Sequence, residues 1–259
     1  MYRNVVALSS KDHAGKRLRP HQGYEFARGE TVMPVSAAEL PQLVARLPIG
    51  FLDSGRNGLR PMALLGIDTR TNLLVAPDGR WLQDYVPAAI RRYPFILMRR
   101  SGDGDMGVAV DMDSELLADT DGERLFTDDG EASEHFSRIV DLLRQFEGGM
   151  RATARACRRL SEAGLLADWS PTVEVAGKHW RLNGMQRVDE QALNGLDNDA
   201  FVALRDDNAV ALAYAQLLSM AQLPRLVRLA QARARQQGPD GKRRNRSRSD
   251  EEIRFNFDA

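Results

Sequence analysis

The chain has 259 residues, and its 36 basic and 36 acidic side chains give a formal net charge of zero. This balance gives no overall electrostatic reason to expect a nucleic acid or a membrane surface as a partner. The single cysteine, Cys157, excludes an internal disulfide and a multi-cysteine metal site. Since Cys157 falls within a predicted helix, we expect it to be a buried structural thiol.

No apolar run approaches the roughly 20 residues that a membrane-spanning helix needs. The N-terminal apolar run is also too short for the core of a secretion signal. We therefore expect a cytoplasmic chain without a membrane span.

The first half of the chain reads as short strands separated by turns. A short extended piece precedes a helix over residues 36–47, where Ser36 and Glu39 form a capping-box pattern and Pro48 ends the helix. Apolar runs of strand length then follow at 61–68, 71–80, 93–99, 106–112 and 124–130. These runs predict an antiparallel sheet with one or two helices laid on it.

The second half changes to a helical period. Residues 132–166 read as amphipathic helix with a break or kink at Gly148 and Gly149. Residues 170–189 alternate as a small hairpin that turns at 176–179, and further helices follow to residue 235, with Pro224 kinking or restarting the last. The order predicts an α+β class, with a mainly antiparallel N-terminal sheet packed by C-terminal helices.

The C-terminal segment differs from the rest in composition. We expect a single α+β domain over 1–235 and a disordered basic tail over 236–259. The basic cluster from Lys242 to Arg248 is either a solvated end or a contact for phosphates or an acidic partner. We therefore do not expect the domain to bind nucleic acid, which would be met only through the basic tail.

Motifs for metal or nucleotide chemistry are missing from the sequence. The four histidines, His13, His21, His135 and His179, follow no metal-ligand spacing, and residues 101–107 lack the further ligands of a calcium loop. No phosphate-binding glycine loop, dinucleotide fingerprint or serine-hydrolase elbow is present. We expect no metal, no cofactor and no catalytic constellation.

The densest stretch of the chain is residues 78–100, which contains Trp81, Tyr85, Tyr93 and Phe95. Large aromatic groups usually belong to cores, and we expect Trp81 and Phe95 to do so. Arg91 and Arg92 allow two interpretations, since a guanidinium here would pair with an internal aspartate such as Asp84 or Asp111, or with a ligand carboxylate or phosphate.

The run WLQDYVPAAIRRYPFILM, residues 81–98, resembles the hallmark of the SapC family of bacterial proteins. Supporting pieces lie at His13, 27–40, 48–51, 63–66, 71–75, 111–114, 124–130, Thr153, 158–166 and 182–193. The resemblance covers roughly residues 1–230 and leaves the basic tail outside.

The resemblance implies an association with a bacterial surface layer, from which SapC-like proteins take their name. Their genes often accompany outer-membrane receptors and flavin-dependent halogenases. Some carry a peptide-transport label, but a permease role disagrees with a chain that has no spanning run. No catalytic residues of the family are established, so none can be transferred to this sequence.

Two functions therefore stay open. The favoured one is a non-catalytic cytoplasmic binding or accessory protein, with a protein partner in a surface-layer or envelope-uptake system. The alternative is an enzyme or small-molecule binder whose pocket gathers His13, Trp81, Tyr85, Arg91 and Arg92. The position of these side chains, in an open pocket or tied up internally, separates the two.

Overall fold

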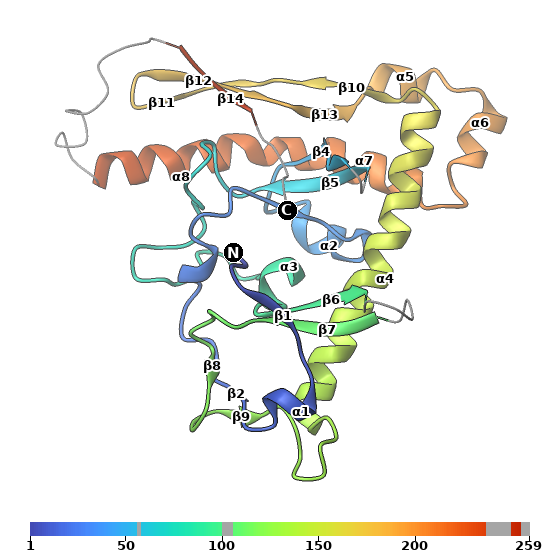
Figure 1. Cartoon of the computed structure of the whole chain (residues 1–259). Coiled ribbons are helices and arrows are strands. Elements are labelled where there is room, and N and C mark those ends of the chain that lie inside the picture. The colour runs from blue at the N-terminus through green and yellow to red at the C-terminus, as the bar shows by residue number, and fades with distance from the viewer. Residues whose placement is uncertain (56–57, 100–105, 237–249, 255–259) are drawn as a thin grey trace.

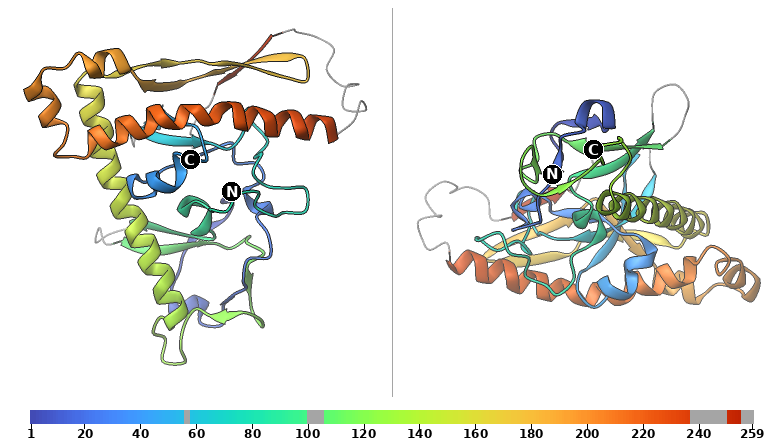
Figure 2. Two further views of the ribbon diagram at one scale, coloured as in Figure 1. Left: turned by 180° about the vertical axis from the view of Figure 1, so that it is seen from behind. Right: turned by 90° about the horizontal axis from the view of Figure 1, so that it is seen from below.

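The computed structural model describes residues 1–55, 58–99, 106–236 and 250–254 (Figure 1). Its mixture of helices and mainly antiparallel sheets confirms the α+β class. The long helix α4 (Glu134–Glu162) runs along one side from the lower strands to the upper ones (Figures 1 and 2). It contacts strands of both the five-stranded sheet and the lower sheet, so it connects the two layers.

The main sheet has five antiparallel strands in the order β10-β13-β4-β5-β3. Their bounds are β3 Val32–Pro34, β4 Ile49–Asp53, β5 Leu59–Leu64, β10 Leu166–Trp169 and β13 Met185–Val188. Met185 of β13 lies opposite Leu52 of β4. β10 and β13 thus extend the N-terminal sheet, a pairing that the sequence did not predict.

Two smaller sheets form the lower part of the molecule. One has the order β1-β7-β6 and the other the order β8-β2-β9, all antiparallel. The bounds are β1 Val5–Ala7, β2 Arg17–Leu18, β6 Phe95–Arg99, β7 Met106–Asp111, β8 Leu117–Ala118 and β9 Glu123–Arg124. The predicted strand at 71–80 forms only the isolated bridge Val75–Trp81. Of the predicted strand at 124–130, Arg124 ends β9, and Phe126 forms an isolated bridge with Ala132.

The predicted hairpin turn is confirmed between β11 (Thr172–Val175) and β12 (Lys178–Asn183). Ala176 and Gly177 both have positive φ there, as a tight two-residue turn requires. β14 (Asp250–Arg254) pairs with β12 in parallel, an element the sequence did not predict. The rest of the tail, 237–249 and 255–259, lies outside the described residues, so its disorder stays a prediction.

The remaining helices are short, apart from α7 and α8. They are α1 Ser10–His13, η1 Glu25–Ala27, η2 Ala37–Glu39, α2 Leu40–Leu43, α3 Ala88–Arg91, α5 Glu190–Asn194, α6 Asn198–Ala203, α7 Ala209–Ser219, η4 Met220–Gln222 and α8 Leu223–Gln236. Pro224 lies in the first turn of α8, where its missing N–H costs nothing, so the predicted restart of the helix is confirmed.

The predicted break at Gly148 and Gly149 is wrong, because α4 is continuous through both. A Cβ at Gly149 would clash with the Ser36 hydroxyl, so this glycine allows η2 to approach the helix closely. Thr153 completes the contact, since its hydroxyl accepts a hydrogen bond from the Ala37 N–H at 2.7 Å and donates one to the Gly149 carbonyl. Gly149 therefore serves packing between elements, whereas a Cβ at Gly148 would meet no atom within 4 Å.

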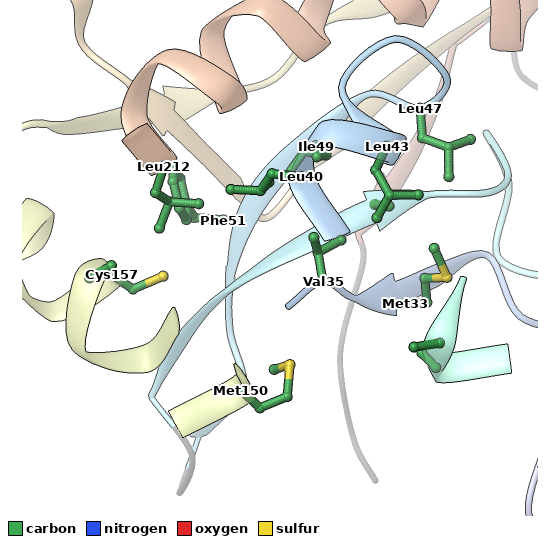
Figure 3. Close-up of a cluster of buried hydrophobic side chains, with 14 of the residues drawn as sticks. Met33, Val35, Leu40, Leu43, Leu47, Ile49, Phe51, Met150, Cys157 and Leu212 are labelled. Atoms are coloured by element: carbon green, nitrogen blue, oxygen red, sulfur yellow. The ribbon is translucent and has the colours of Figure 1, made fainter. Parts of the chain in front are cut away.

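The main hydrophobic core lies between the five-stranded sheet, α2, α4 and α7 (Figure 3). Ile49 and Phe51 of β4, Leu43 of α2 and Leu212 of α7 are fully or almost fully buried there. Cys157 is buried in the same core, as predicted, and burial raises the pKa of its thiol to about 12. This cysteine is therefore an inert packing residue at neutral pH.

Candidate functional site

The first half of the signature segment (defined as residues 81–95) is held by internal contacts. The Trp81 indole N–H donates to the Tyr85 carbonyl at 2.8 Å, and its ring meets the Tyr24 ring edge-on. Trp81 packs against the main core but stays only half-buried. The expectation of a core tryptophan is thus met only in part.

Glu39 is the internal partner of this half, and its relative exposure to solvent is only 7%. Its Oε1 accepts hydrogen bonds from the Tyr85 hydroxyl at 2.8 Å and from the Ala88 N–H at 2.7 Å. The predicted capping box is therefore wrong, since Ser36 begins η2 without a side-chain cap and Glu39 satisfies the start of α3 instead. Burial and the bond to Glu39 raise the pKa of Tyr85.

The two arginines of the segment have different surroundings. The Arg91 side chain is exposed, with its guanidinium 5.7 Å from the Tyr85 ring centre and Nη2 3.5 Å from the Tyr85 hydroxyl. The Arg92 guanidinium stacks 4.5 Å from the centre of the Phe146 ring, and Nη1 lies 3.5 Å from Glu147 Oε1. Both polar contacts are at the long limit of a hydrogen bond.

Neither arginine pairs with the aspartates that the sequence suggested. Asp84 forms a two-pronged pair with Arg46, with N–O distances of 2.8 Å. Asp111 accepts bonds from the backbone N–H groups of Arg3 and Asn4 and from the Tyr93 hydroxyl. The internal-aspartate interpretation is therefore wrong for both aspartates, and Arg92 has Glu147 in their place.

The Asp111 network closes the wall behind the arginines. Burial acts to raise the pKa of Asp111, but its hydrogen bonds from Asn4, Arg3, Asp113 and Tyr93 lower the pKa overall. The Tyr93 ring stacks on Phe26 with 4.2 Å between ring centres, and this fixes the residue that follows the arginines. A rigid aromatic layer thus supports Arg92.

The arginines line a pocket of about 340 Å³ between α3, the loop after β2 and the start of α4, here named the arginine pocket. Its walls are mostly apolar, formed by Leu18, Pro20, Tyr93, Phe95, Ile139 and Leu142. Its polar lining residues are Arg19, His21, Arg91, Arg92, Glu123 and His135. Leu18, Ile139 and Leu142 are only partly buried, so apolar surface stays open to an occupant.

The histidines that line the arginine pocket are His21 and His135, whereas the sequence grouped His13 with the arginines. His13 ends α1, where its Nδ1 is 3.2 Å from the backbone of Ser9, and it is not among the pocket's lining residues. His21 stacks on Tyr24, and loss of water around its ring lowers its pKa, against a hydrogen bond with the Tyr93 backbone that raises it. Trp81 and Tyr85, which the sequence also grouped with the arginines, are not among the residues that line the pocket.

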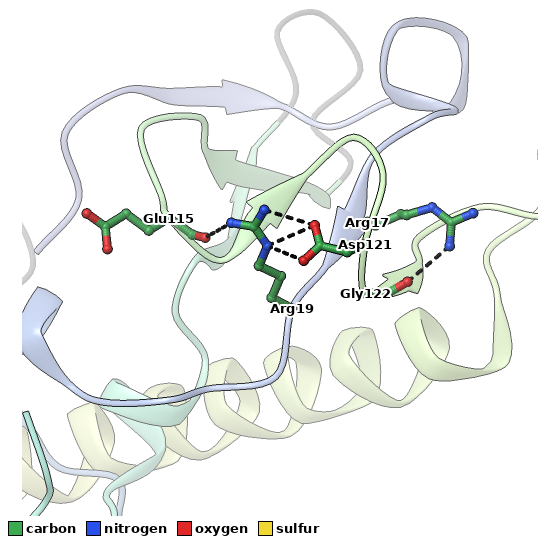
Figure 4. A network of polar contacts seen from close by, with 5 residues as sticks. All are labelled: Arg17, Arg19, Glu115, Asp121 and Gly122. Carbon is green, nitrogen blue, oxygen red and sulfur yellow. Dashed lines mark hydrogen bonds and ion pairs between the residues drawn. The ribbon is translucent and has the colours of Figure 1, made fainter.

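A polar network fixes the loop that forms one wall of the arginine pocket (Figure 4). Arg19 forks onto Asp121 with N–O distances of 2.8 to 3.0 Å, and its Nη1 donates to the Glu115 carbonyl. Arg17 donates to the Gly122 carbonyl at 3.0 Å. Because Asp121 already engages the Arg19 guanidinium, the charge available to an occupant comes from Arg91 and Arg92.

Two other cavities are more polar. One of about 740 Å³ adjoins the arginine pocket and shares Arg19, Pro20 and Tyr93 with it. The other, about 920 Å³, lies beside the turn after β4 and the β10–β13 strands, with Asp53, Asp168 and Asn183 among its lining residues. Both have mainly polar linings, so neither offers the apolar walls of the arginine pocket.

Within the described ranges, no three histidine, cysteine or acidic side chains gather as a metal-binding group. In the same part of the chain, no helix has both the length and the apolar character needed to cross a bilayer.

Sequence reasoning found the arginines but missed Glu39, His21 and His135. Glu39 lies 46 residues from Tyr85, and no local pattern signals that pairing. His21 and His135 were visible only as members of a set of four histidines without metal spacing. The fold brings both to the arginine pocket through the loop after β2 and the first turn of α4.

The site is thus a small pocket built on an α+β scaffold, with paired arginines over an apolar cavity. The family model of SapC matches residues 8–226, which is most of the chain, and the protein belongs to the SapC family. No curated protein and no solved structure matches the chain.

Proposed function

We propose that this SapC-family chain is a non-catalytic binding protein, acting in the cytoplasm as an accessory to a surface-layer or envelope-uptake system. Its ligand occupies the arginine pocket. The observation that carries this proposal is the pair of adjacent arginines, Arg91 and Arg92, beside an apolar cavity. Within the part of the chain that the structure describes, neither guanidinium makes a hydrogen bond shorter than 3.5 Å.

The hydrogen-bonding capacity of the two guanidiniums supports a binding role. A guanidinium carries five N–H donors, and its geometry matches carboxylate and phosphate groups. The buried Nε of Arg92 has no acceptor among the described residues, so the fold has not built an internal carboxylate cage for it.

The engagement of the other polar groups in the signature segment also favours binding over catalysis. The Tyr85 hydroxyl and the Ala88 N–H both donate to Glu39, and the Trp81 N–H donates to the Tyr85 carbonyl. These groups position α3 and the arginines that end it. Support for a partner in the cell envelope comes from the SapC resemblance described above and from family membership.

Ligand retention tests the pocket. The full chain is purified under mild conditions and studied by native mass spectrometry, in parallel with the double variants R91Q/R92Q and R155Q/R159Q. The second variant is a matched control, because Arg155 and Arg159 are exposed arginines in the C-terminal half of α4, far in sequence from the signature segment. Both form ion pairs with Asp207. We expect a bound small molecule in the wild type and the control and its loss from R91Q/R92Q. Equal ligand content in all three proteins would contradict the proposal.

The accessory role is tested separately by affinity purification from native cells with a tagged chain. We expect enrichment of a surface-layer or outer-membrane uptake component relative to an unrelated tagged protein. Enrichment of no envelope component would contradict this part of the proposal and leave the pocket result unaffected.

A further inference from the structure

We infer that the ligand of the arginine pocket is a single-headed amphiphilic anion, with one carboxylate or phosphate head and a compact apolar body. This inference rests on the proposed function, because it names the chemical class that the same pocket takes.

The charge around the pocket favours an anionic head. Arg91 has no carboxylate partner among the ion pairs of the described residues, and Arg92 has only Glu147 at 3.5 Å. Glu123 is the carboxylate among the pocket's lining residues, and its side chain is exposed, so water screens its charge. The two guanidiniums therefore offer donors that no short hydrogen bond occupies within the described residues, and the neighbouring carboxylates are Glu147, at the long limit of an ion pair with Arg92, and the exposed Glu123.

The position of Arg92 also suits a head group that binds in a fixed orientation. Stacking on Phe146 at 4.5 Å holds the guanidinium plane, and Tyr93 fixes the backbone that follows. A guanidinium held in this way loses less side-chain entropy when it binds a carboxylate or a phosphate oxygen pair. Arg91, which is exposed, can close over the same head group.

The apolar walls determine the rest of the ligand. Leu18, Ile139 and Leu142 present partly exposed aliphatic surface, and buried Phe95 lies beneath them. A volume of about 340 Å³ is near the small end of the range of ~300–1,000 Å³ that ligand pockets span. A highly polar body would leave its hydrogen-bonding groups without partners along these walls. A short alkyl or aromatic body fits them.

Isothermal titration calorimetry of the full chain with defined probes tests the class. Hexanoate, octanoate and decanoate measure the apolar body, since each buried methylene contributes roughly 0.8 kcal/mol, or about a fourfold gain in affinity, until the pocket is full. Decyl phosphate, decanol and decyltrimethylammonium measure the head at constant tail. We expect decanoate or decyl phosphate to bind at least about tenfold more tightly than the alcohol and the cation.

The same titrations with variants show whether the probes bind in the arginine pocket. R91Q/R92Q should weaken decanoate at least about tenfold and leave decanol little changed, whereas R155Q/R159Q should change neither. Leu142→Ser should flatten the gain per methylene. The ratio of decanoate to decyl phosphate affinity then tells a carboxylate from a phosphate ligand.

Several outcomes would overturn the inference. If decanol or the ammonium probe binds as tightly as decanoate, the anionic head group is rejected. If inorganic phosphate binds as tightly as decyl phosphate, or affinity does not rise along the carboxylate series, the apolar body is rejected. If no probe binds at millimolar concentration, the whole class is wrong. In each case, Arg91- and Arg92-dependent retention of a native ligand would still support the proposed function.

Discussion

The two halves of the signature segment make opposite use of their polar groups. In the first half, Tyr85 and Ala88 both donate to buried Glu39 at under 3.0 Å. In the second half, the guanidiniums of Arg91 and Arg92 make no hydrogen bond shorter than 3.5 Å within the described residues, and they line a pocket. A single stretch of about fifteen residues thus contains both a rigid support and an available binding surface.

The difference teaches which residues of a dense aromatic stretch deserve a functional test. The aromatic groups drew attention as a ligand platform, yet the fold uses Trp81 and Tyr85 to fix α3 from behind. The arginines follow directly after, at the end of that helix. Their value for binding depends on the rigidity of the first half, because a prepositioned guanidinium loses less entropy on binding.

The largest expected effect comes from Phe95, the residue that ends the segment inside the core. Its ring is 1% exposed and packs 5.5 Å from the Phe136 ring centre. Phe95→Ala should lower the free energy of unfolding by about 3–5 kcal/mol, the usual cost of truncating a buried aromatic. Chemical denaturation measures it. Leu82→Ala is the control, since Leu82 is 46% exposed and should cost under about 1 kcal/mol. Equal losses would show that the segment has no inward anchor at Phe95.

Tyr85→Phe tests the rigid half directly. Removal of the hydroxyl leaves the Glu39 carboxylate with the Ala88 N–H as its remaining donor, and Glu39 Oε2 already has no partner among the described residues. We expect a loss of about 1.5–3 kcal/mol, since the lost bond is to a charged acceptor. The control is Tyr24→Phe, because no hydrogen bond of the Tyr24 hydroxyl is present in the described part of the chain. A loss no larger than that of Tyr24→Phe would mean that Glu39 does not depend on Tyr85.

Alkaline pH tests the wall behind the arginines through Tyr2, whose hydroxyl donates to the Phe95 carbonyl at 3.1 Å. Burial raises the pKa of Tyr2 to about 12, although the nearby Arg92 acts to lower it. The neutral form is thus favoured in the folded state. Its contribution is fully present below pH 10, the ordinary pKa, and is lost as the pH rises through about 12.

The shift of about two pKa units corresponds to at most ~2.7 kcal/mol. Unfolding free energies of the wild type and Tyr2→Phe are compared from pH 8 to 11.5. The wild type should lose more stability than Tyr2→Phe over this interval. Parallel curves would show that Tyr2 ionises as freely in the folded chain as in the unfolded one.

Local patterns predicted the parts of the fold that local chemistry determines. The α+β class, the turn at Ala176 and Gly177 and the restart of a helix near Pro224 follow from alternation, turn residues and proline geometry. The missed features depend on residues far apart in sequence. The pairing of β13 with β4 joins residues more than a hundred positions apart, and Gly149 could be understood only once Ser36 was placed against α4.

The same limit applies to the candidate site. Arg91 and Arg92 could be selected because charged residues inside an apolar stretch need a specific reason. Their neighbours His21, Leu18 and Ile139 could not, since each comes from a separate element and looks ordinary in its own local sequence. The pocket forms only when the fold brings these separate elements together.

The smallest expected changes in stability belong to the arginines themselves, and they separate a ligand contact from a structural strut. Arg92 is 16% exposed at its side chain and stacks on Phe146, so Arg92→Gln should cost about 1 kcal/mol, the range for a partly desolvated cation–π contact. Arg91→Gln should cost under about 0.5 kcal/mol, because Arg91 is exposed and has no ion pair among the described residues. Denaturant midpoints of the two single variants measure this difference.

A loss of about 3–5 kcal/mol for Arg92→Gln would be the cost of breaking a buried ion pair, and it would assign Arg92 to the rigid half, with Glu147 as its true partner. Arg91 would then be the arginine left to hold a ligand. Small losses of stability in both variants, together with loss of the bound ligand, would show that both arginines belong to the binding half. The rigid half would then end with α3.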